Sequence, residues 1–353
     1  ILYSVSGGEA NVTGVDETGT GDVVIPAELG GYPVTAIGNE AFESNYNITS
    51  IVIPEGVETI GEYCFYRCDW LEEIWFPSTL RFVGKRAFGD DCFVRKLHIP
   101  DIASYSQIEY ENLFANPFWY DDEDGYEWWE EEYEKKLYIG DSTEPVTDIV
   151  IPEGVEGIGA YTFYGNSFMK SLVLPDTLTE IGEYAFRECE NLESVSFGDS
   201  LEHIYDYAFE SCEKLGSFTL PDSLLTIGEW AFSGNYAMTE VTIPDKVREI
   251  PLGTFSYCEA LAEVNIGSGV EVIGQEAFEN IAATEFIIPD NVKSLGNHLF
   301  YGSEKLETVV IGDGLTQAGD WMFNECYNLK NVTLGDGLTE LSDKFFKIYD
   351  HVD

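Results

Sequence analysis

The chain has 353 residues, of which 44% are hydrophobic and 14% aromatic, and this is enough apolar material for a continuous core. Its 65 acidic and 18 basic residues give a formal net charge of −47, which excludes nucleic acid and anionic membranes as partners because both demand a positive footprint. No stretch approaches the ~20 apolar residues of a membrane span, and no signal peptide is visible in a chain that begins abruptly at Ile1.

Phenylalanine recurs at a fixed interval along most of the chain. Successive members of the series are 23 residues apart, except for 22 between Phe278 and Phe300 and 75 between Phe88 and Phe163. Self-similarity at a period of roughly 20 to 50 residues is typical of a solenoid, in which each coil buries its apolar side against the next. The series consists of Phe42, Phe65, Phe88, Phe163, Phe186, Phe209, Phe232, Phe255, Phe278, Phe300, Phe323 and Phe346.

Each unit repeats one order of elements. An alternating pair of apolar residues such as Val241 and Ile243 predicts a short strand with one buried face, and the Pro or Gly that follows ends this strand. A second short extended segment comes after the turn, and an Ala-Phe pair fills the interior of the coil. No unit is long enough for an ordinary amphipathic helix. The pattern therefore predicts a mainly β solenoid of ~23-residue coils with few or no regular helices.

We expect residues 1–353 to form a single elongated domain. Residues 1–41 would be the N-terminal cap and first unit, and residues 42–91 regular repeats. Residues 92–148 depart from the period and form an irregular unit with an acidic and aromatic insertion. Regular repeats return over 149–338, and 339–353 form the C-terminal end.

The unit resembles the BspA-type, or Treponema pallidum-type, leucine-rich repeat, whose pattern is L-x-x-I-x-I-P-x-x-V-x-x-I-G-x-x-A-F-x-x-C. The match runs from Ile51 to Cys68 and again from Leu172 to Cys189, and residues 23–38 resemble the usual first unit of that family. The resemblance implies a right-handed leucine-rich-repeat solenoid. It also implies a cell-surface or secreted protein, bacterial or protist, that serves in adhesion or host contact, and it implies no chemistry.

Two places in the sequence favour partner binding. The outward strand position is mostly small or β-branched, but it holds Trp75 in one unit and His98 in the next. The insertion mixes acids with Trp and Tyr, which dominate binding energy at interfaces; alternatively, it docks on the local basic residues Arg81, Lys85, Arg86, Arg95 and Lys96. The partner-binding candidates are Trp75, His98, Phe118, Trp119, Tyr120, Tyr126, Trp128, Trp129 and Tyr133.

An acidic residue occupies the turn after the strand in most units. These residues are Glu55, Glu153, Asp176, Asp199, Asp222, Asp245, Asp290, Asp313 and Asp336. We interpret each carboxylate as solvated and as accepting hydrogen bonds from its own turn. The alternative is calcium that bridges adjacent coils, because this ion takes clustered oxygen ligands; the metal candidates are Asp176, Asp199, Asp222 and Asp245. The acids of 121–134 match an EF-hand loop weakly, since Tyr120 stands where an aspartate is needed.

Two further columns flank the repeat phenylalanine. Three residues after it lie five of the seven cysteines, at a place where other units have Asn, and we interpret these cysteines as buried free thiols. Metal ligation and a disulfide between Cys189 and Cys212 are the alternatives. Two residues before it, six of the twelve units carry Tyr or Trp, which either cover the gaps between coils or bind sugars.

Motifs for catalysis are missing: the sequence has no HExxH, GxSxG, P-loop or dinucleotide-binding glycine pattern. We therefore expect no enzymatic activity and no cofactor other than the candidate calcium. The favoured function is a non-enzymatic interaction protein for adhesion or for binding a host or microbial protein through the solenoid face and the 118–134 insertion. The alternative is a carbohydrate-binding or calcium-stiffened structural module.

Overall fold

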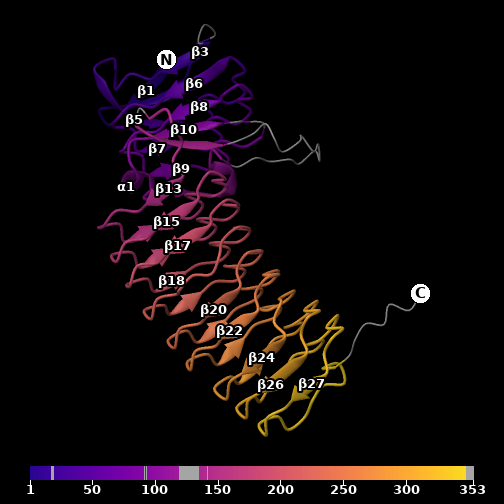
Figure 1. The fold of residues 1–353 in the computed structure, drawn as a ribbon. Helices are drawn as coiled ribbons and strands as arrows, with labels where there is room; N and C mark the ends of the chain where they lie inside the picture. The colour runs from indigo at the N-terminus through magenta and orange to yellow at the C-terminus, as the bar shows by residue number, and fades with distance from the viewer. Residues whose placement is uncertain (17–19, 91, 93, 119–134, 141, 347–353) are drawn as a thin grey trace, which may run out of the picture. The chain divides into compact units, whose positions relative to one another are not determined.

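The computed structural model describes residues 1–16, 20–90, 92, 94–118, 135–140 and 142–346. The chain is mainly β and 2% helical, and it forms a β-solenoid of about 13 turns with a spacing of ~23 residues (Figure 1). The prediction of a mainly β solenoid is confirmed. Among the described residues, no helix is long and apolar enough to cross a membrane.

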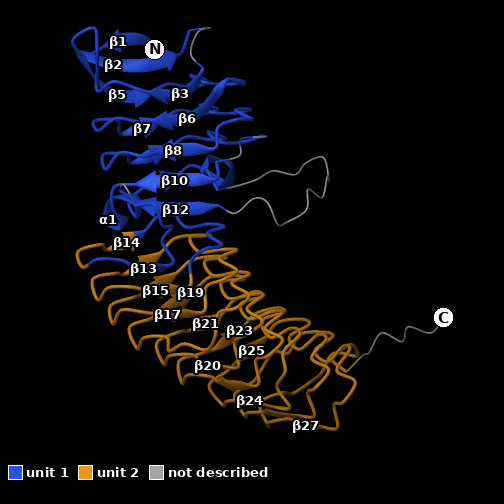
Figure 2. Cartoon of the chain, turned by 45° about the horizontal axis from the view of Figure 1, so that its top comes forward, with its two compact units in different colours: residues 1–152, 158–169 blue, residues 153–157, 170–353 orange. Residues whose placement is uncertain are grey.

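Two compact units make up the chain (Figure 2). Unit 1 comprises residues 1–152 and 158–169, and unit 2 comprises residues 153–157 and 170–353. The single-domain boundaries expected from the sequence stay a prediction.

Unit 1 contains short strands, one α-helix and one 3₁₀ helix. Its elements are β1 (Leu2–Ser6), β2 (Glu9–Gly14), β3 (Gly21–Val24), β4 (Glu28–Leu29), β5 (Tyr32–Ile37), β6 (Ile48–Val52), β7 (Thr59–Ile60), β8 (Glu73–Trp75), β9 (Phe82–Val83), β10 (Lys96–Ile99), α1 (Ile102–Tyr105), β11 (Glu109–Tyr110), η1 (Leu113–Ala115), β12 (Lys136–Ile139) and β13 (Asp148–Val150). Strand β14 (Gly157–Ile158) lies at a boundary between the two units.

Unit 2 contains strands alone among its described elements. They are β15 (Ser171–Val173), β16 (Glu180–Ile181), β17 (Ser194–Ser196), β18 (His203–Ile204), β19 (Thr226–Ile227), β20 (Glu240–Thr242), β21 (Glu249–Ile250), β22 (Glu263–Asn265), β23 (Val272–Ile273), β24 (Glu285–Ile288), β25 (Ser294–Leu295), β26 (Thr308–Ile311) and β27 (Asn331–Thr333).

Strands β1 to β12 of unit 1 form two sheets. One has the order β12-β10-β8-β6-β3, with all neighbours parallel, and the other has the order β1-β2-β5-β7-β9-β11. Strands β1 and β2 are antiparallel, as are β4 and β5. Parallel pairing in register places one position of the repeat above the same position of the next coil. The first sheet thereby aligns Val24, Val52, Trp75, His98 and Tyr138 in one outward column.

In unit 2 the sheet that contains the first strand of each coil is interrupted twice. Strands β20 and β22 pair with each other, and β24, β26 and β27 form a separate sheet, while residues 217–219 form no strand. At both interruptions the first inward strand position holds a phenylalanine, Phe218 or Phe286, where the other coils have Val, Ile or Leu. Phe286 contacts the rings of both Phe278 and Phe300, with centroids 4.9 and 4.8 Å away. A ring at this position thus accompanies each break in the ladder.

The repeat phenylalanines form the core, as predicted, except at the last coil. Phe186, Phe209 and Phe232 are fully buried and stack in parallel, with centroids 5.1 and 5.5 Å apart. Each such burial stabilises the fold by roughly 1.5–3 kcal/mol. Phe346 was expected inside but is 50% exposed, whereas its neighbour Phe345 is fully buried. Phe346 still stacks on Phe323 at 5.9 Å, but no described coil follows it to cover its other face.

The loop around each phenylalanine joins neighbouring coils without forming a helix. In the coil of Phe186, Tyr184 and Glu188 both have positive φ, at 58° and 60°. This left-handed geometry turns alternate N–H groups toward the next coil, where Phe186 donates to the Ala208 carbonyl at 2.8 Å. Positions two residues before and after the phenylalanine have positive φ in nearly every coil. The backbone is therefore satisfied between coils where an isolated unit would leave it unpaired.

The cysteine column forms a ladder of hydrogen bonds. The thiol of Cys258 donates to the Phe232 carbonyl at 3.2 Å, across 26 residues. Asn235 Nδ2 and Ser303 Oγ make the same bond from the same place in their coils, at 3.1 and 3.2 Å. All seven cysteines are buried, and none of them forms a disulfide, which agrees with the interpretation as structural thiols.

Candidate partner-binding surface

Three stacked rings occupy the outward face of the parallel sheet in unit 1. The rings of Trp75 and His98 lie 4.4 Å apart between centroids, and those of His98 and Tyr138 lie 4.8 Å apart. They come from β8, β10 and β12, whose parallel register sets equivalent positions one above another. Tyr138 was missed in the sequence, although Lys136–Ile139 repeats the motif of Lys96–Ile99 with Tyr in place of His. The parallel register of β10 and β12 places Tyr138 beside the predicted pair, Trp75 and His98.

Exposure differs along this aromatic column. His98 and Tyr138 are 8% and 7% exposed, whereas Trp75 is partly exposed. His98 Nε2 lies 2.8 Å from Glu73 Oε1, a carboxylate that also lies 3.6 Å from Lys96 Nζ. Val24, at the far end of the same outward column, is 67% exposed. Trp75 is thus the ring that a partner can reach, and the rings behind it hold it in place.

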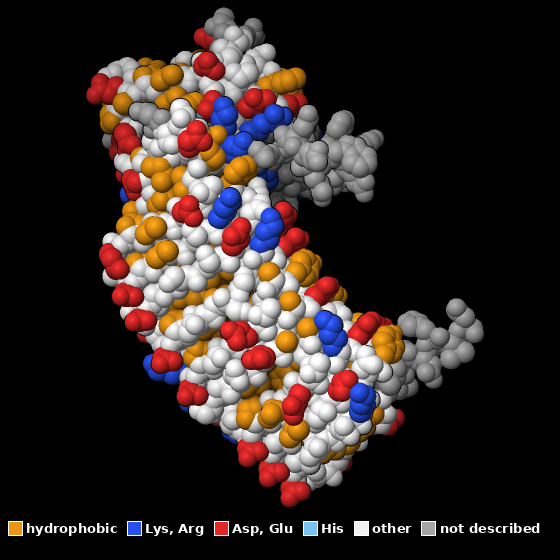
Figure 3. Space-filling view, in the orientation of Figure 1, with side chains coloured by type: hydrophobic (Ala, Val, Ile, Leu, Met, Phe, Trp, Pro, Cys, Tyr) orange, Lys and Arg blue, Asp and Glu red, His pale blue; other side chains and the backbone are white. Residues whose placement is uncertain are grey.

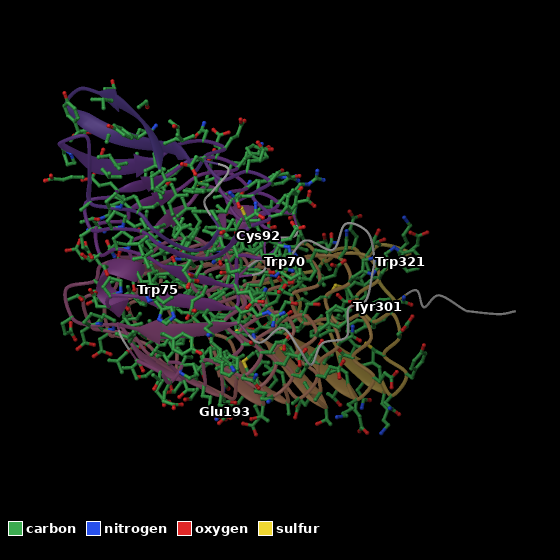
Figure 4. The ribbon with its side chains drawn as sticks, turned by 90° about the horizontal axis from the view of Figure 1, so that it is seen from above. Trp70, Trp75, Cys92, Glu193, Tyr301 and Trp321 are labelled. Carbon is green, nitrogen blue, oxygen red and sulfur yellow. The ribbon has the colours of Figure 1, made fainter. Side chains whose placement is uncertain are left out.

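Two further exposed rings lie in the loops that precede two strands of the same sheet. Trp70 (Figure 4) is 60% exposed and lies just before β8. Tyr46 is 50% exposed and lies just before β6. Sequence reasoning missed both because the repeat imposes no residue type at these places. A Trp at a loop position was the signal available for Trp70, because Trp is enriched at interfaces.

The insertion is described at its two ends. Phe118 is 1% exposed; its N–H donates to Asn116 Oδ1 at 2.7 Å, and its carbonyl accepts from Lys135 Nζ. Phe118 is therefore a core residue of unit 1, and as a partner-binding candidate it lacks the exposure that contact requires. The other insertion candidates, Trp119, Tyr120, Tyr126, Trp128, Trp129 and Tyr133, lie outside the described residues.

Basic residues gather on unit 1 near both ends of the insertion (Figure 3). The Arg86 guanidinium lies over the Phe114 ring at 4.6 Å, and Lys136 Nζ lies over the Phe168 ring at 5.0 Å. Eight of the 18 basic residues fall within 67–136, namely Arg67, Arg81, Lys85, Arg86, Arg95, Lys96, Lys135 and Lys136. The basic residues of this strongly acidic chain are therefore concentrated in one part of unit 1, although 17 acidic residues fall within the same range.

Six of the nine carboxylates of the acidic column accept hydrogen bonds from the next coil, and these are Glu55, Glu153, Asp176, Asp245, Asp290 and Asp313. Asp176 Oδ1 accepts from the Asp199 N–H at 3.1 Å, and Asp245 Oδ1 accepts from the Ser268 N–H and Oγ at 2.7 and 2.9 Å. The expected acceptor role holds, but the donors differ, because the in-register coil brings the following turn within reach. The bonds from Ser268 lower the pKa of the Asp245 carboxyl below its usual value.

Calcium ligation by this column has no geometric support in the described part of the chain. Asp176, Asp199, Asp222 and Asp245 are all exposed. No group of three or more His, Cys, Asp or Glu residues in the described ranges could hold a metal ion. The calcium site stays a prediction.

The Tyr and Trp column before each phenylalanine packs between coils. Tyr184 and Tyr207 stack at 4.7 Å, and the Arg187 guanidinium lies 5.5 and 5.9 Å from the two rings. The Trp230 ring lies against Gly253 of the next coil, so closely that a Cβ there would overlap it. These rings are partly buried, and their packing favours the structural interpretation over sugar binding.

Comparisons with known proteins point to one family. A family model described as "BspA type Leucine rich repeat region (6 copies)" matches residues 33–117, 141–262 and 231–351. A leucine-rich repeat protein from Bacteroides ovatus is 23% identical, with a TM-score of 0.52 over 94% of this chain and 92% of that one. The pneumococcal vaccine antigen PcpA is 18% identical, with a TM-score of 0.59 over 98% of this chain and 89% of that one. No curated protein matches the sequence.

Proposed function

The chain belongs to the BspA-type leucine-rich repeat family, and on this premise we propose that it is a non-enzymatic, cell-surface or secreted protein that binds a host or microbial surface or matrix protein. Proteins of this family are typically at the surface or secreted, and they are generally binding proteins without enzymatic activity. Adhesion is the role that follows from such binding.

The observation that carries this proposal is the exposed Trp75 at the end of the aromatic column. A partly exposed Trp that stacks on His98 is fixed before any partner arrives, so binding costs little side-chain entropy. Trp residues of this kind dominate the binding energy of interfaces. Trp70, which is 60% exposed, adds a second accessible ring just before the same strand.

The proposal includes the insertion in partner binding. Residues 119–134 come between Phe118 and β12 in the sequence. Their Trp and Tyr residues are of the types that dominate binding energy at interfaces. Neighbouring acids would complement a partner's basic residues.

The test begins with a pull-down against host matrix proteins and microbial surface extracts, followed by affinity measurements on the captured protein. We expect Trp75→Thr, which has the Thr found at this place in other coils, to weaken binding at least about tenfold. Deletion of 121–134 should have a similar effect. Tyr327→Ala is the matched control, because Tyr327 is a 66% exposed ring in unit 2.

Thermal melts of each variant separate loss of binding from loss of fold. Unchanged affinity in both the Trp75→Thr variant and the deletion would refute the proposal. A glycan array decides the alternative: glycan binding that Trp75→Thr abolishes, with no captured protein, would favour a carbohydrate-binding module.

A further inference from the structure

A groove lies on unit 2 between β22 and β24, where the sheet is interrupted. Its volume is about 450 Å³, which is in the range of small ligand sites. The strands that border it follow one another along the unit (Figure 1). This surface is separate from the aromatic column of unit 1, and the inference drawn from it goes beyond the proposed function.

The groove follows from an irregular coil in the sequence. From Phe278 to Phe300 the spacing is 22 residues, one fewer than usual, and Ala283 takes the place of the usual Leu one residue early. Phe286 then enters the core between Phe278 and Phe300, with centroids 4.9 and 4.8 Å from them. Strand β24 pairs forward with β26, and it does not pair back with β22.

Because β22 and β24 do not pair, a backbone N–H group on this side of β22 lacks a partner in the described part of the chain, and two apolar side chains are more exposed than their equivalents. Ile243 donates its N–H to the Asn265 carbonyl at 2.8 Å, but the equivalent N–H of Ile266 has no partner among the described residues. Val264 and Ile266, which line the groove, are partly exposed, whereas the equivalent Val241 and Ile243 are each 1% exposed. An apolar floor with a free strand edge is the arrangement that binds an extended peptide by strand addition.

Two acidic residues, Glu263 and Glu285, line the same groove, and Glu240 lies beside Glu263 on β20. Glu240 and Glu263 stand opposite each other in the β20–β22 register, and Glu285 holds the same place in the next coil. Like charges directly opposite each other destabilise a sheet. None of the three forms a salt bridge within the described ranges. A cationic partner would remove this repulsion, and the field of the acidic surface would attract it.

We propose that the groove between β22 and β24 binds an extended, basic polypeptide segment in which apolar residues alternate with Lys or Arg. The apolar side chains face Val264 and Ile266, and the cationic side chains face Glu263 and Glu285 on the outward side. A carbonyl of the segment accepts the free N–H of Ile266. A second copy of this chain does not fit, because each copy carries a net charge of −47.

The test uses fluorescence anisotropy with a labelled peptide of alternating lysine and valine. We expect saturable binding that weakens at least about tenfold in Glu263→Lys/Glu285→Lys. Glu202→Lys/Glu249→Lys is the matched control: it changes the net charge equally at exposed sites away from the groove, and it should retain most of the affinity. Trp75→Thr should bind the peptide like the parent, since its site lies in unit 1.

Ile287→Ser tests the apolar half of the proposal. Ile287 lines the groove and is 56% exposed, so its replacement should leave the fold intact and weaken binding several-fold. Three results would overturn the proposal. They are no binding at about 1 mM peptide, equal loss of affinity in the control pair, and equally tight binding of a lysine–serine or glutamate–valine peptide.

Discussion

Cys258, Asn235 and Ser303 hold the same place in their coils, and each donates a hydrogen bond to the phenylalanine carbonyl of the preceding coil. The three side chains differ in polarity and volume, but each is small and has a donor. The carbonyl is buried between coils, where an unsatisfied acceptor costs free energy. What the position requires is thus a short donor, and this requirement explains why Cys, Asn and Ser interchange.

Replacement of Cys258 tests this requirement. We expect Cys258→Val to lower the free energy of unfolding by about 1–3 kcal/mol, because the Phe232 carbonyl loses its donor. Cys258→Ser keeps a donor and should cost less. Urea denaturation of both variants measures the difference, and a valine variant as stable as the serine variant would contradict the role of the bond. Burial raises the pKa of the Cys258 thiol to about 12, so thiol reagents should modify it only after unfolding.

The stacking of the core phenylalanines leads to a second prediction about stability. Phe209→Ala should destabilise the protein by about 3–5 kcal/mol, because Phe209 is fully buried between two rings. Phe346→Ala is the control within the same column and should cost much less, since Phe346 is 50% exposed. Far-ultraviolet circular dichroism melts compare them. Similar melting curves for Phe209→Ala and the parent protein would show that the ring is not a core residue.

The buried carboxyl of Glu279 should make the stability of the fold depend on pH. Glu279 is 7% exposed and accepts a hydrogen bond from Ser256 Oγ at 3.0 Å, and its burial raises its pKa above the ordinary value. A carboxyl whose pKa is higher in the folded than in the unfolded state stabilises the fold at pH values below the unfolded-state pKa. This stabilisation is lost as the pH rises through the folded-state pKa. Glu279→Gln should therefore melt at a higher temperature than the parent at pH 7. The two melting temperatures should converge near pH 4, and a lower value for the variant at pH 7 would contradict this sign.

At the scale of the coil, one contact lets us separate backbone strain from side-chain packing. Gly253 and Gly234 both have positive φ, at 62° and 71°, but only Gly253 lies against a ring, that of Trp230. A Cβ at Gly234 would meet nothing closer than Ser211 Oγ at 3.3 Å. Left-handed geometry costs a residue with a Cβ about 1–2 kcal/mol at either place.

Gly253→Ala should therefore lose at least ~1 kcal/mol more than Gly234→Ala, because the new methyl group must displace the indole ring. Chemical denaturation followed by far-ultraviolet circular dichroism measures both. In a Trp230→Ala background the excess should disappear, as a double-mutant cycle would show. An excess that persists there would mean that the ring is not the cause.

Regular coils were predictable from the sequence, but their irregularities were not. Val241 and Ile243 alternate as a buried strand does, and the structure has β20 at this place. Phe218 and Phe286 satisfy the same apolar pattern, so hydrophobicity alone could not show that the ladder breaks there. The 22-residue spacing was visible, but its effect depends on how Phe286 packs in three dimensions.

Residues of the candidate surface were predictable only where they occupy a regular position of the repeat. Trp75 was found because a large ring at an outward strand position departs from its column. Tyr138 was missed because the insertion hides its equivalence to His98, and only the strand register reveals it. Trp70 lies in a loop with no repeat constraint. The exposure of Phe118 could not be judged from sequence, since a buried anchor and an exposed contact have the same residue type.

For the whole molecule, the excess of acid should dominate the response to salt. Figure 3 shows acidic side chains spread along unit 2, and the net charge of −47 implies strong self-repulsion. We expect the melting temperature to rise by several degrees as sodium chloride increases from about 10 mM to about 0.5 M, because salt screens this repulsion. A melting temperature that falls over this range would contradict the expectation.

Calcium chloride at matched ionic strength tests the metal alternative. Carboxylates such as Asp176 and Asp245 already accept hydrogen bonds from the next coil, so we expect no shift beyond that of sodium chloride. A larger shift at millimolar calcium, abolished by Asp199→Asn/Asp222→Asn, would instead support ions bridging the coils.

Recurring hydrogen bonds and ring stacks of this protein connect fixed places of adjacent coils, at offsets such as 23 or 26 residues. A duplicated regular coil would therefore bring with it every donor, acceptor and ring that its two neighbours need. Unequal recombination within the gene could lengthen or shorten the array by whole coils while leaving each remaining contact intact. An array that is longer or shorter by whole coils should thus keep its fold, and each added coil would extend the outward surface by one more strand.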